Sequence, residues 1–179
     1  MNDSIISILL LLLYIIVLLL LVFFAIAGVS LAPWVPLYPK DKKRIMDLLA
    51  LRDGDVLYEL GSGTGIITVA ASRVSGVRAT GLELSPVLYW YSLLKKIVLR
   101  APRAKFLLRN LYTVDLSDAT VIYFYGLPKN NHKIVKKLLA DCKPGTRIIS
   151  YTFSMDGLPL IERNKPIETV VPIYIYQIP

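Results

Sequence analysis

The hydrophobic pattern divides the chain into two unequal parts. Positions 5–29 carry no charged residue, and Ile8–Ile26 consists of Leu, Ile, Val, Phe and Ala with one Tyr. A helix needs about 20 apolar residues to cross the hydrocarbon layer of a bilayer. The pattern therefore predicts one N-terminal transmembrane anchor over residues 1–30. A cleaved signal peptide is the alternative, but the long apolar run and the absence of Lys or Arg beside Asp3 favour the anchor.

Beyond the anchor, short apolar runs alternate with amphipathic stretches, and this predicts a parallel sheet with helices on both faces. Strands are expected at 55–60, 78–84, 105–110, 119–125, 146–152 and 169–178, with 160–164 as a hairpin partner of the last strand, and helices at 42–51, 64–74, 86–100 and 131–142. The predicted fold class is α/β and Rossmann-like. The predicted organisation is an anchor (1–30), a Pro-rich entry segment (31–41) and one catalytic domain (42–179).

The entry segment and the charges place the domain relative to the membrane. Three prolines in Ala32–Pro39 exclude a regular helix, while Trp34 and Tyr38 are residue types found at the headgroup boundary. All 21 Lys and Arg lie at or after Lys40, and the net charge is +8. The positive-inside rule then predicts a single-pass membrane protein with a cytoplasmic domain. A nucleic-acid partner is disfavoured, because no RNA-module motif with stacking aromatic residues is present.

The chain offers one cysteine, Cys142, and one histidine, His132. No disulfide can form within it, and a zinc site of the usual Cys/His kind is excluded, so no metal is expected. His132 lies in a polar stretch that is typical of a surface helix.

The segment Glu59–Gly65, with sequence ELGSGTG, follows a predicted strand and opens a predicted helix. A glycine-rich turn in that context indicates a nucleotide-type ligand. The dinucleotide fingerprint requires glycine at the sixth position from Gly61, which here is Ile66, and no P-loop Gly-Lys-Ser/Thr follows. A carboxylate at the mouth of the turn, Glu59, would repel a pyrophosphate but suits the cationic groups of S-adenosylmethionine.

A second carboxylate, Glu83, ends the second predicted strand 18 positions beyond Gly65. An acid at that place accepts hydrogen bonds from ribose hydroxyls. Either acid alone is more often a surface charge, but both at these spacings predict a cofactor site.

With these motifs the chain resembles the class I methyltransferases, whose sheet has seven strands and an antiparallel last strand. The sequence VPLYP at 35–39 resembles the entry of a family of small protein lysine methyltransferases, which includes archaeal broad-specificity enzymes and the mitochondrial enzyme acting on the c-type ring protein of ATP synthase. Segments 115–121 and 143–150 also resemble that family. The resemblance implies S-adenosylmethionine as cofactor, contacted by Val35, Pro36, Tyr38, Glu59, Gly61, Ser62, Gly63, Thr64, Gly65, Glu83, Leu84 and Asn110. For Val35, Pro36 and Tyr38, an interfacial linker remains the competing interpretation.

Aromatic residues end the fourth and fifth predicted strands, where ligands of such sheets bind. Tyr125 and Tyr151 are therefore the candidate catalytic residues, lining an acceptor pocket. The alternative is that tyrosine is simply favourable in strands. No general base is assigned.

The function predicted from the sequence is methylation, by S-adenosylmethionine, of lysine side chains on membrane proteins. A lipid, quinone or other small-molecule acceptor and a non-catalytic binding module remain alternatives. A dinucleotide oxidoreductase is disfavoured by Ile66 and Glu59.

Overall fold

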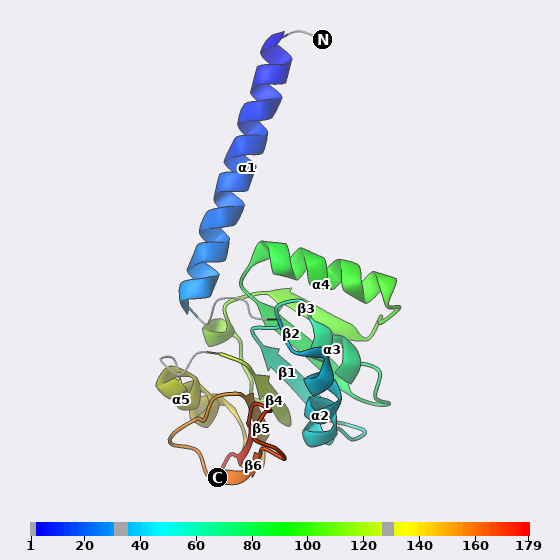
Figure 1. Cartoon of the computed structure of the whole chain (residues 1–179), viewed down its shortest axis with the longest axis vertical. Helices are drawn as coiled ribbons and strands as arrows, with labels where there is room; N and C mark the ends of the chain where they lie inside the picture. The colour runs from blue at the N-terminus through cyan, green and yellow to red at the C-terminus, as the bar shows by residue number, and fades with distance from the viewer. Residues whose placement is uncertain (1–2, 31–35, 127–130) are drawn as a thin grey trace.

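The structure is a computed structural model that describes residues 3–30, 36–126 and 131–179. Its elements, in chain order, are α1 (Asp3–Ser30), α2 (Pro39–Leu49), β1 (Val56–Leu60), α3 (Ile66–Ala71), β2 (Arg78–Glu83), α4 (Pro86–Val98), β3 (Ala104–Leu108), the 3-10 turn η1 (Leu111–Thr113), β4 (Val121–Phe124), α5 (Asn131–Asp141), β5 (Arg147–Tyr151), β6 (Leu160–Asn164) and β7 (Ile173–Gln177). Figure 1 shows α1 projecting from a folded domain that contains all the other elements.

The seven strands form one sheet in the order β3-β2-β1-β4-β5-β7-β6. β1 to β5 run parallel, and β7 pairs antiparallel with both β5 and β6. This confirms the predicted Rossmann-like sheet with an antiparallel last strand, and the predicted hairpin. The strand order reverses between β1 and β4, and ligands of open α/β sheets bind at such a switch point, beyond the carboxyl ends of the strands.

Alternating side chains on β1 face two separate cores. Leu57 packs with Ile45 of α2 and Ile67 of α3, whereas Leu60 packs with Ile134 of α5 on the opposite face. α4 joins the first face at the β3 edge of the sheet, where its side chains surround Phe106. The glycine turn therefore lies between α3 and the strand ends, with α2 and α4 on either side.

The N-terminal helix α1 stands outside these cores. Its segment Ser4–Ala25 has a mean hydropathy of 3.5 and no part of that window is buried. A helix of this length and composition is able to cross a membrane, and a signal sequence meets the same criterion.

Candidate functional site

The turn between β1 and α3 depends on its glycines. Gly61, Gly63 and Gly65 have φ angles of 77°, 52° and 69°, a left-handed region that other residues rarely adopt. A Cβ added at Gly65 would lie 2.4 Å from Cζ of Phe106. The backbone N–H groups of Gly61 and Ser62 both donate to the carbonyl oxygen of Leu82, so the turn is fixed to the end of β2. The site is thus a rigid backbone cradle, open beyond the strand ends.

Glu83 lies beside this cradle with its carboxylate held by backbone groups. Its Oε2 accepts the N–H of Gly63 at 2.7 Å, and its Oε1 accepts the N–H groups of Leu84 and Ser85 at 2.9 and 2.7 Å. Burial raises the pKa of Glu83, and the three N–H donors oppose that rise. A carboxylate has about four acceptor positions. Glu83 is therefore oriented by the protein with capacity left for a ligand hydroxyl.

Glu59 is the more deeply buried of the two acids, at 4% exposure. Its Oε2 accepts both the N–H and the hydroxyl of Thr68, at 2.8 and 2.6 Å. Burial raises its pKa to about 7, against the lowering effect of these hydrogen bonds, and the nearby charge of Glu83 raises it further. A cation bound near Glu59 would favour its ionised form.

A cleft of about 390 Å³ adjoins the glycine turn. Three segments form its walls: the entry segment, the start of α3 with its preceding turn, and one flank of α4. The lining residues are Pro36, Leu37, Thr64, Ile66, Val87, Leu88, Tyr91 and Lys95. Its size lies in the range of small-molecule sites.

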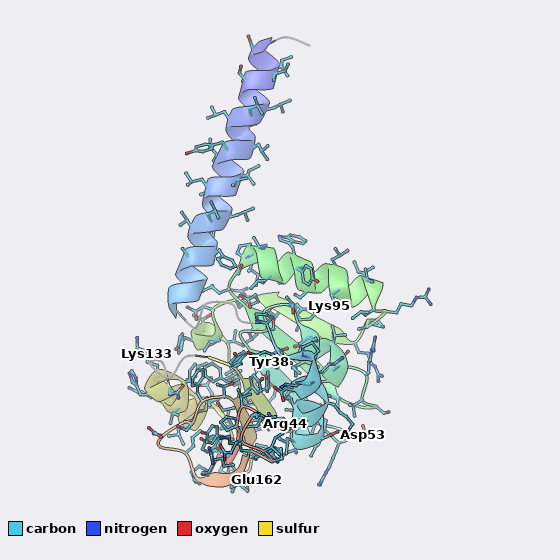
Figure 2. The ribbon with its side chains drawn as sticks, in the orientation of Figure 1. Tyr38, Arg44, Asp53, Lys95, Lys133 and Glu162 are labelled. Carbon is cyan, nitrogen blue, oxygen red and sulfur yellow. The ribbon has the colours of Figure 1, made fainter. Side chains whose placement is uncertain are left out.

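Lys95 belongs to this cleft, although the sequence predicted it on the polar side of its helix. In Figure 2 it lies on the domain side of α4. Burial lowers its pKa, while the negative charge of Glu59 opposes this change. The position of Lys95 could not be found from the sequence, because it depends on how α4 packs against the sheet.

The aromatic candidates form a second group beyond β4 and β5. The rings of Tyr125 and Tyr151 pack edge to face with centroids 4.8 Å apart. The hydroxyl of Tyr151 donates to Oδ2 of Asp41 at 2.7 Å, and Arg44 pairs with Oδ1 of the same carboxylate at 3.1 Å. Tyr151 is 1% exposed, whereas Tyr125 is half-buried. Burial raises the pKa of both tyrosines, so both are neutral at physiological pH.

Other predicted site residues lie at different distances from the cleft. Pro36 and Thr64 line it, and the hydroxyl of Ser62 is buried without a hydrogen-bond partner. Tyr38 is exposed and precedes α2, and the ammonium of Lys40 lies over its ring.

Two predicted residues lie outside this description of the cleft. Asn110 accepts the N–H of Tyr112 and thereby caps η1. Val35 lies outside the described residues.

The sequence analysis missed two residues of the site, Asp41 and Thr68. Each is buried and holds a predicted residue in place: Asp41 binds Tyr151, and Thr68 binds Glu59. Thr68 follows Gly65 by one helical turn, a spacing that could have identified it.

Comparison with known proteins identifies relatives of this site. Residues 59–162 match the model of the ANTKMT methyltransferase domain. The chain is 31% identical over 132 residues to a protein-lysine N-methyltransferase of Saccharolobus islandicus, covering 72% of this chain and 81% of that protein. It is 33% identical to the lysine N-methyltransferase of Mus musculus that is named for the C-type ring protein of ATP synthase, over 68% of this chain and 49% of that protein. The chain thus spans about half the length of the mouse relative.

Solved structures agree on the fold. An RNA methyltransferase from Salinibacter ruber, in complex with S-adenosyl-L-homocysteine, superposes with a TM-score of 0.74 at 32% identity, covering 81% of this chain and 94% of that one. A SAM-dependent O-methyltransferase from Thermotoga maritima has a TM-score of 0.65 at 17% identity, over 81% and 67% of the respective chains. The second likeness concerns the fold alone.

Proposed function

Because this chain belongs to the ANTKMT methyltransferase domain family, we propose that it methylates lysine side chains of proteins at a membrane surface. It is an S-adenosylmethionine-dependent methyltransferase related to protein-lysine N-methyltransferases. The observation that carries the lysine proposal is the 31% identity with the Saccharolobus enzyme over 81% of that protein's length.

The residues present fit the cofactor. Glu83, oriented by three backbone N–H groups, is suited to accept ribose hydroxyls, and the buried hydroxyl of Ser62 still lacks a partner. Glu59 supplies negative charge near the turn, which suits an ammonium and a sulfonium rather than phosphates. When bound, S-adenosylmethionine supplies a methyl group on a sulfonium leaving group.

The chain's part in methyl transfer is then mainly positioning. A C–N bond to the acceptor forms as the C–S bond of the donor breaks, and the two must be aligned at about 3–3.5 Å. A lysine acceptor must first release its proton to solvent, since its free pKa is about 10.4. A dry pocket lowers that pKa because it disfavours the ammonium. We assign the wall of such a pocket to Tyr125, with Tyr151 packed behind it.

The membrane part of the proposal rests on α1 and on the charges that follow it. Ser4–Ala25 is apolar enough to span a bilayer, and Lys40, Lys42, Lys43 and Arg44 follow it while no Lys or Arg precedes it. Under the positive-inside rule the domain would face the cytoplasm. An enzyme anchored in this way would meet acceptor lysines close to the bilayer surface. The name of the mouse relative gives its acceptor as a component of ATP synthase.

The first experiment measures cofactor binding by the full chain in detergent micelles. Titration calorimetry should detect S-adenosylmethionine and not NAD. In Glu83→Gln the affinity for S-adenosylmethionine should fall roughly tenfold to hundredfold, because a hydrogen bond to a charged group contributes about 1.5–3 kcal/mol. The matched control is Glu162→Gln on β6, an exposed carboxylate that bonds only to Asn164 and lies at the far end of the domain in Figure 2. Its affinity should equal that of the unmodified chain.

The acceptor is then identified by transfer of a radiolabelled methyl group to membranes prepared from the source cells. The proposal predicts label in protein that hydrolyses to methyllysine. Label in the lipid extract would replace it with a lipid or quinone acceptor, and label in RNA with a nucleic-acid acceptor. Binding of neither ligand by the folded chain would indicate a non-catalytic module instead.

A further inference from the structure

Helix α4 presents an apolar stripe to its surroundings. Trp90, Leu94, Ile97 and Val98 are 65%, 58%, 72% and 68% exposed. Residues three and four apart lie on one face of a helix, so these side chains form a continuous strip along α4. Scattered apolar residues are ordinary on protein surfaces, whereas contiguous apolar patches indicate an interaction site.

The fold does not use this stripe. α4 packs on the domain through its opposite face, where Ser92 is fully buried and Tyr89 and Leu93 pack against the cluster around Phe106. The stripe residues belong to none of the apolar clusters found among the described residues. Replacing them by charged residues should therefore leave the domain folded.

The position of α4 relative to α1 identifies what the stripe meets. α1 contacts α4 in the structure. Figure 1 shows α4 lying crosswise to α1, at the level of the end of α1 nearest the domain. The candidate span also ends toward that side, at Ala25. A bilayer crossed by α1 would therefore have its surface beside α4.

The charges around the stripe match the same surface. Residues 84–114 contain no Asp or Glu and carry six cationic side chains, Lys95, Lys96, Arg100, Arg103, Lys105 and Arg109. Anionic lipids attract basic residues at the bilayer surface. A helix with Trp and Leu on one face and basic residues at its borders has the composition of helices that lie in the membrane interface.

We propose that α4 lies in the plane of an anionic bilayer surface with its apolar stripe inserted at the headgroup boundary. The domain is then held at two places, by α1 and by α4, and cannot swing freely on its linker. The cofactor cleft is lined by Val87, Tyr91 and Lys95 of the same helix, so it opens at headgroup level. The acceptor lysine must then lie within reach of the headgroups. This proposal rests on the membrane anchoring proposed above.

Fluorescence in the full chain tests the proposal directly. The chain has two tryptophans, so Trp34→Phe leaves Trp90 as the single reporter. This protein is reconstituted into vesicles of phosphatidylcholine and phosphatidylserine that contain lipids brominated either near the glycerol end or near the methyl end of the acyl chain. We expect Trp90 emission to shift to shorter wavelength and to be quenched most by bromine near the glycerol end. A reference protein carries Trp34→Phe, Trp90→Phe and Ile161→Trp. Its tryptophan lies on β6, at the opposite edge of the sheet, and should not be quenched.

Matched charge variants separate insertion from simple proximity. In the Trp34→Phe background, the double variant Leu94→Glu, Ile97→Glu should lose the quenching of Trp90 while its thermal unfolding and its binding of S-adenosylmethionine stay unchanged. Ile161→Glu places a charge on an equally exposed apolar residue away from α4, and should leave the quenching intact.

Each contrary result overturns the proposal in a different way. A chain that fails to float with vesicles has no anchor, and both the anchoring and the docking of α4 fall. A chain that floats but whose Trp90 emits as in water keeps its anchor and refutes the docking alone. Emission that is shifted to shorter wavelength yet unquenched by either lipid would mean that a protein surface, such as a second copy of the chain, covers the stripe.

Discussion

Replacing Glu59 by glutamine is expected to stabilise the folded domain at neutral and alkaline pH. The carboxyl is 4% exposed, and burial raises its pKa from 4.5 to about 7. One pKa unit corresponds to about 1.4 kcal/mol, so ionising Glu59 within the fold costs about 3 kcal/mol of the free energy of unfolding. Glutamine has nearly the same shape, and its amide oxygen can still accept the N–H and hydroxyl of Thr68.

The direction of the pH dependence follows from which state keeps the proton. Below about pH 4.5 the carboxyl is protonated in both states, and Glu59 causes no loss of stability. Between about 4.5 and about 7 the unfolded chain releases the proton while the folded chain retains it, so stability falls as the pH rises. Above about pH 7 the loss is complete and constant. The glutamine variant lacks this loss at every pH.

Urea unfolding of the full chain in detergent measures the effect. Between about pH 5 and about pH 8.5, the unmodified chain should lose about 3 kcal/mol more than Glu59→Gln does. Glu162→Gln, the exposed control on β6, should follow the unmodified chain. Equal pH profiles for the unmodified chain and Glu59→Gln, or a less stable variant at about pH 8.5, would refute the reasoning that Glu59 is an uncompensated buried acid.

Two further substitutions test the frame around the site. Gly65→Ala combines a positive φ with a Cβ placed 2.4 Å from the ring of Phe106, so it should destabilise by about 1–3 kcal/mol more than Gly54→Ala, whose φ is also positive but whose Cβ would meet nothing within 4 Å; paired urea titrations decide this. Tyr151→Phe removes the hydroxyl that donates to the buried Asp41, and should cost about 1–3 kcal/mol in the same titration while leaving the affinity for S-adenosylmethionine unchanged by calorimetry.

The fold was predictable because each strand is an apolar run followed by a turn signal. β6 was predicted with its observed bounds, and β2 to within one residue. The errors have local causes. α3 begins at Ile66 rather than Thr64, because Gly65 has a positive φ and cannot continue a helix. β7 begins at Ile173 rather than Thr169, because Pro172 has no N–H to offer a neighbouring strand.

The site was predictable only where its residues are close in sequence. Glu59 and the glycines fall within one turn, and Glu83 follows by a spacing typical of this fold. The contact of Asp41 with Tyr151 joins residues 110 positions apart, which no local pattern encodes. The apolar stripe of α4 is a similar case. In the sequence, α4 reads as an apolar helix on most sides, and only its packing shows which apolar residues face outward.

The two buried acids bear on the kind of ligand that the fold is built to hold. Glu59 and Glu83 are both buried at the carboxyl ends of neighbouring strands, and burial raises the pKa of each. In a protein without a cationic ligand such a pair lowers stability, because each ionised carboxylate disfavours ionisation of the other. A pyrophosphate would add negative charge to the same place, whereas an ammonium and a sulfonium would offset the charge already there. The feature that weakens the empty fold is therefore the one that selects S-adenosylmethionine over a dinucleotide.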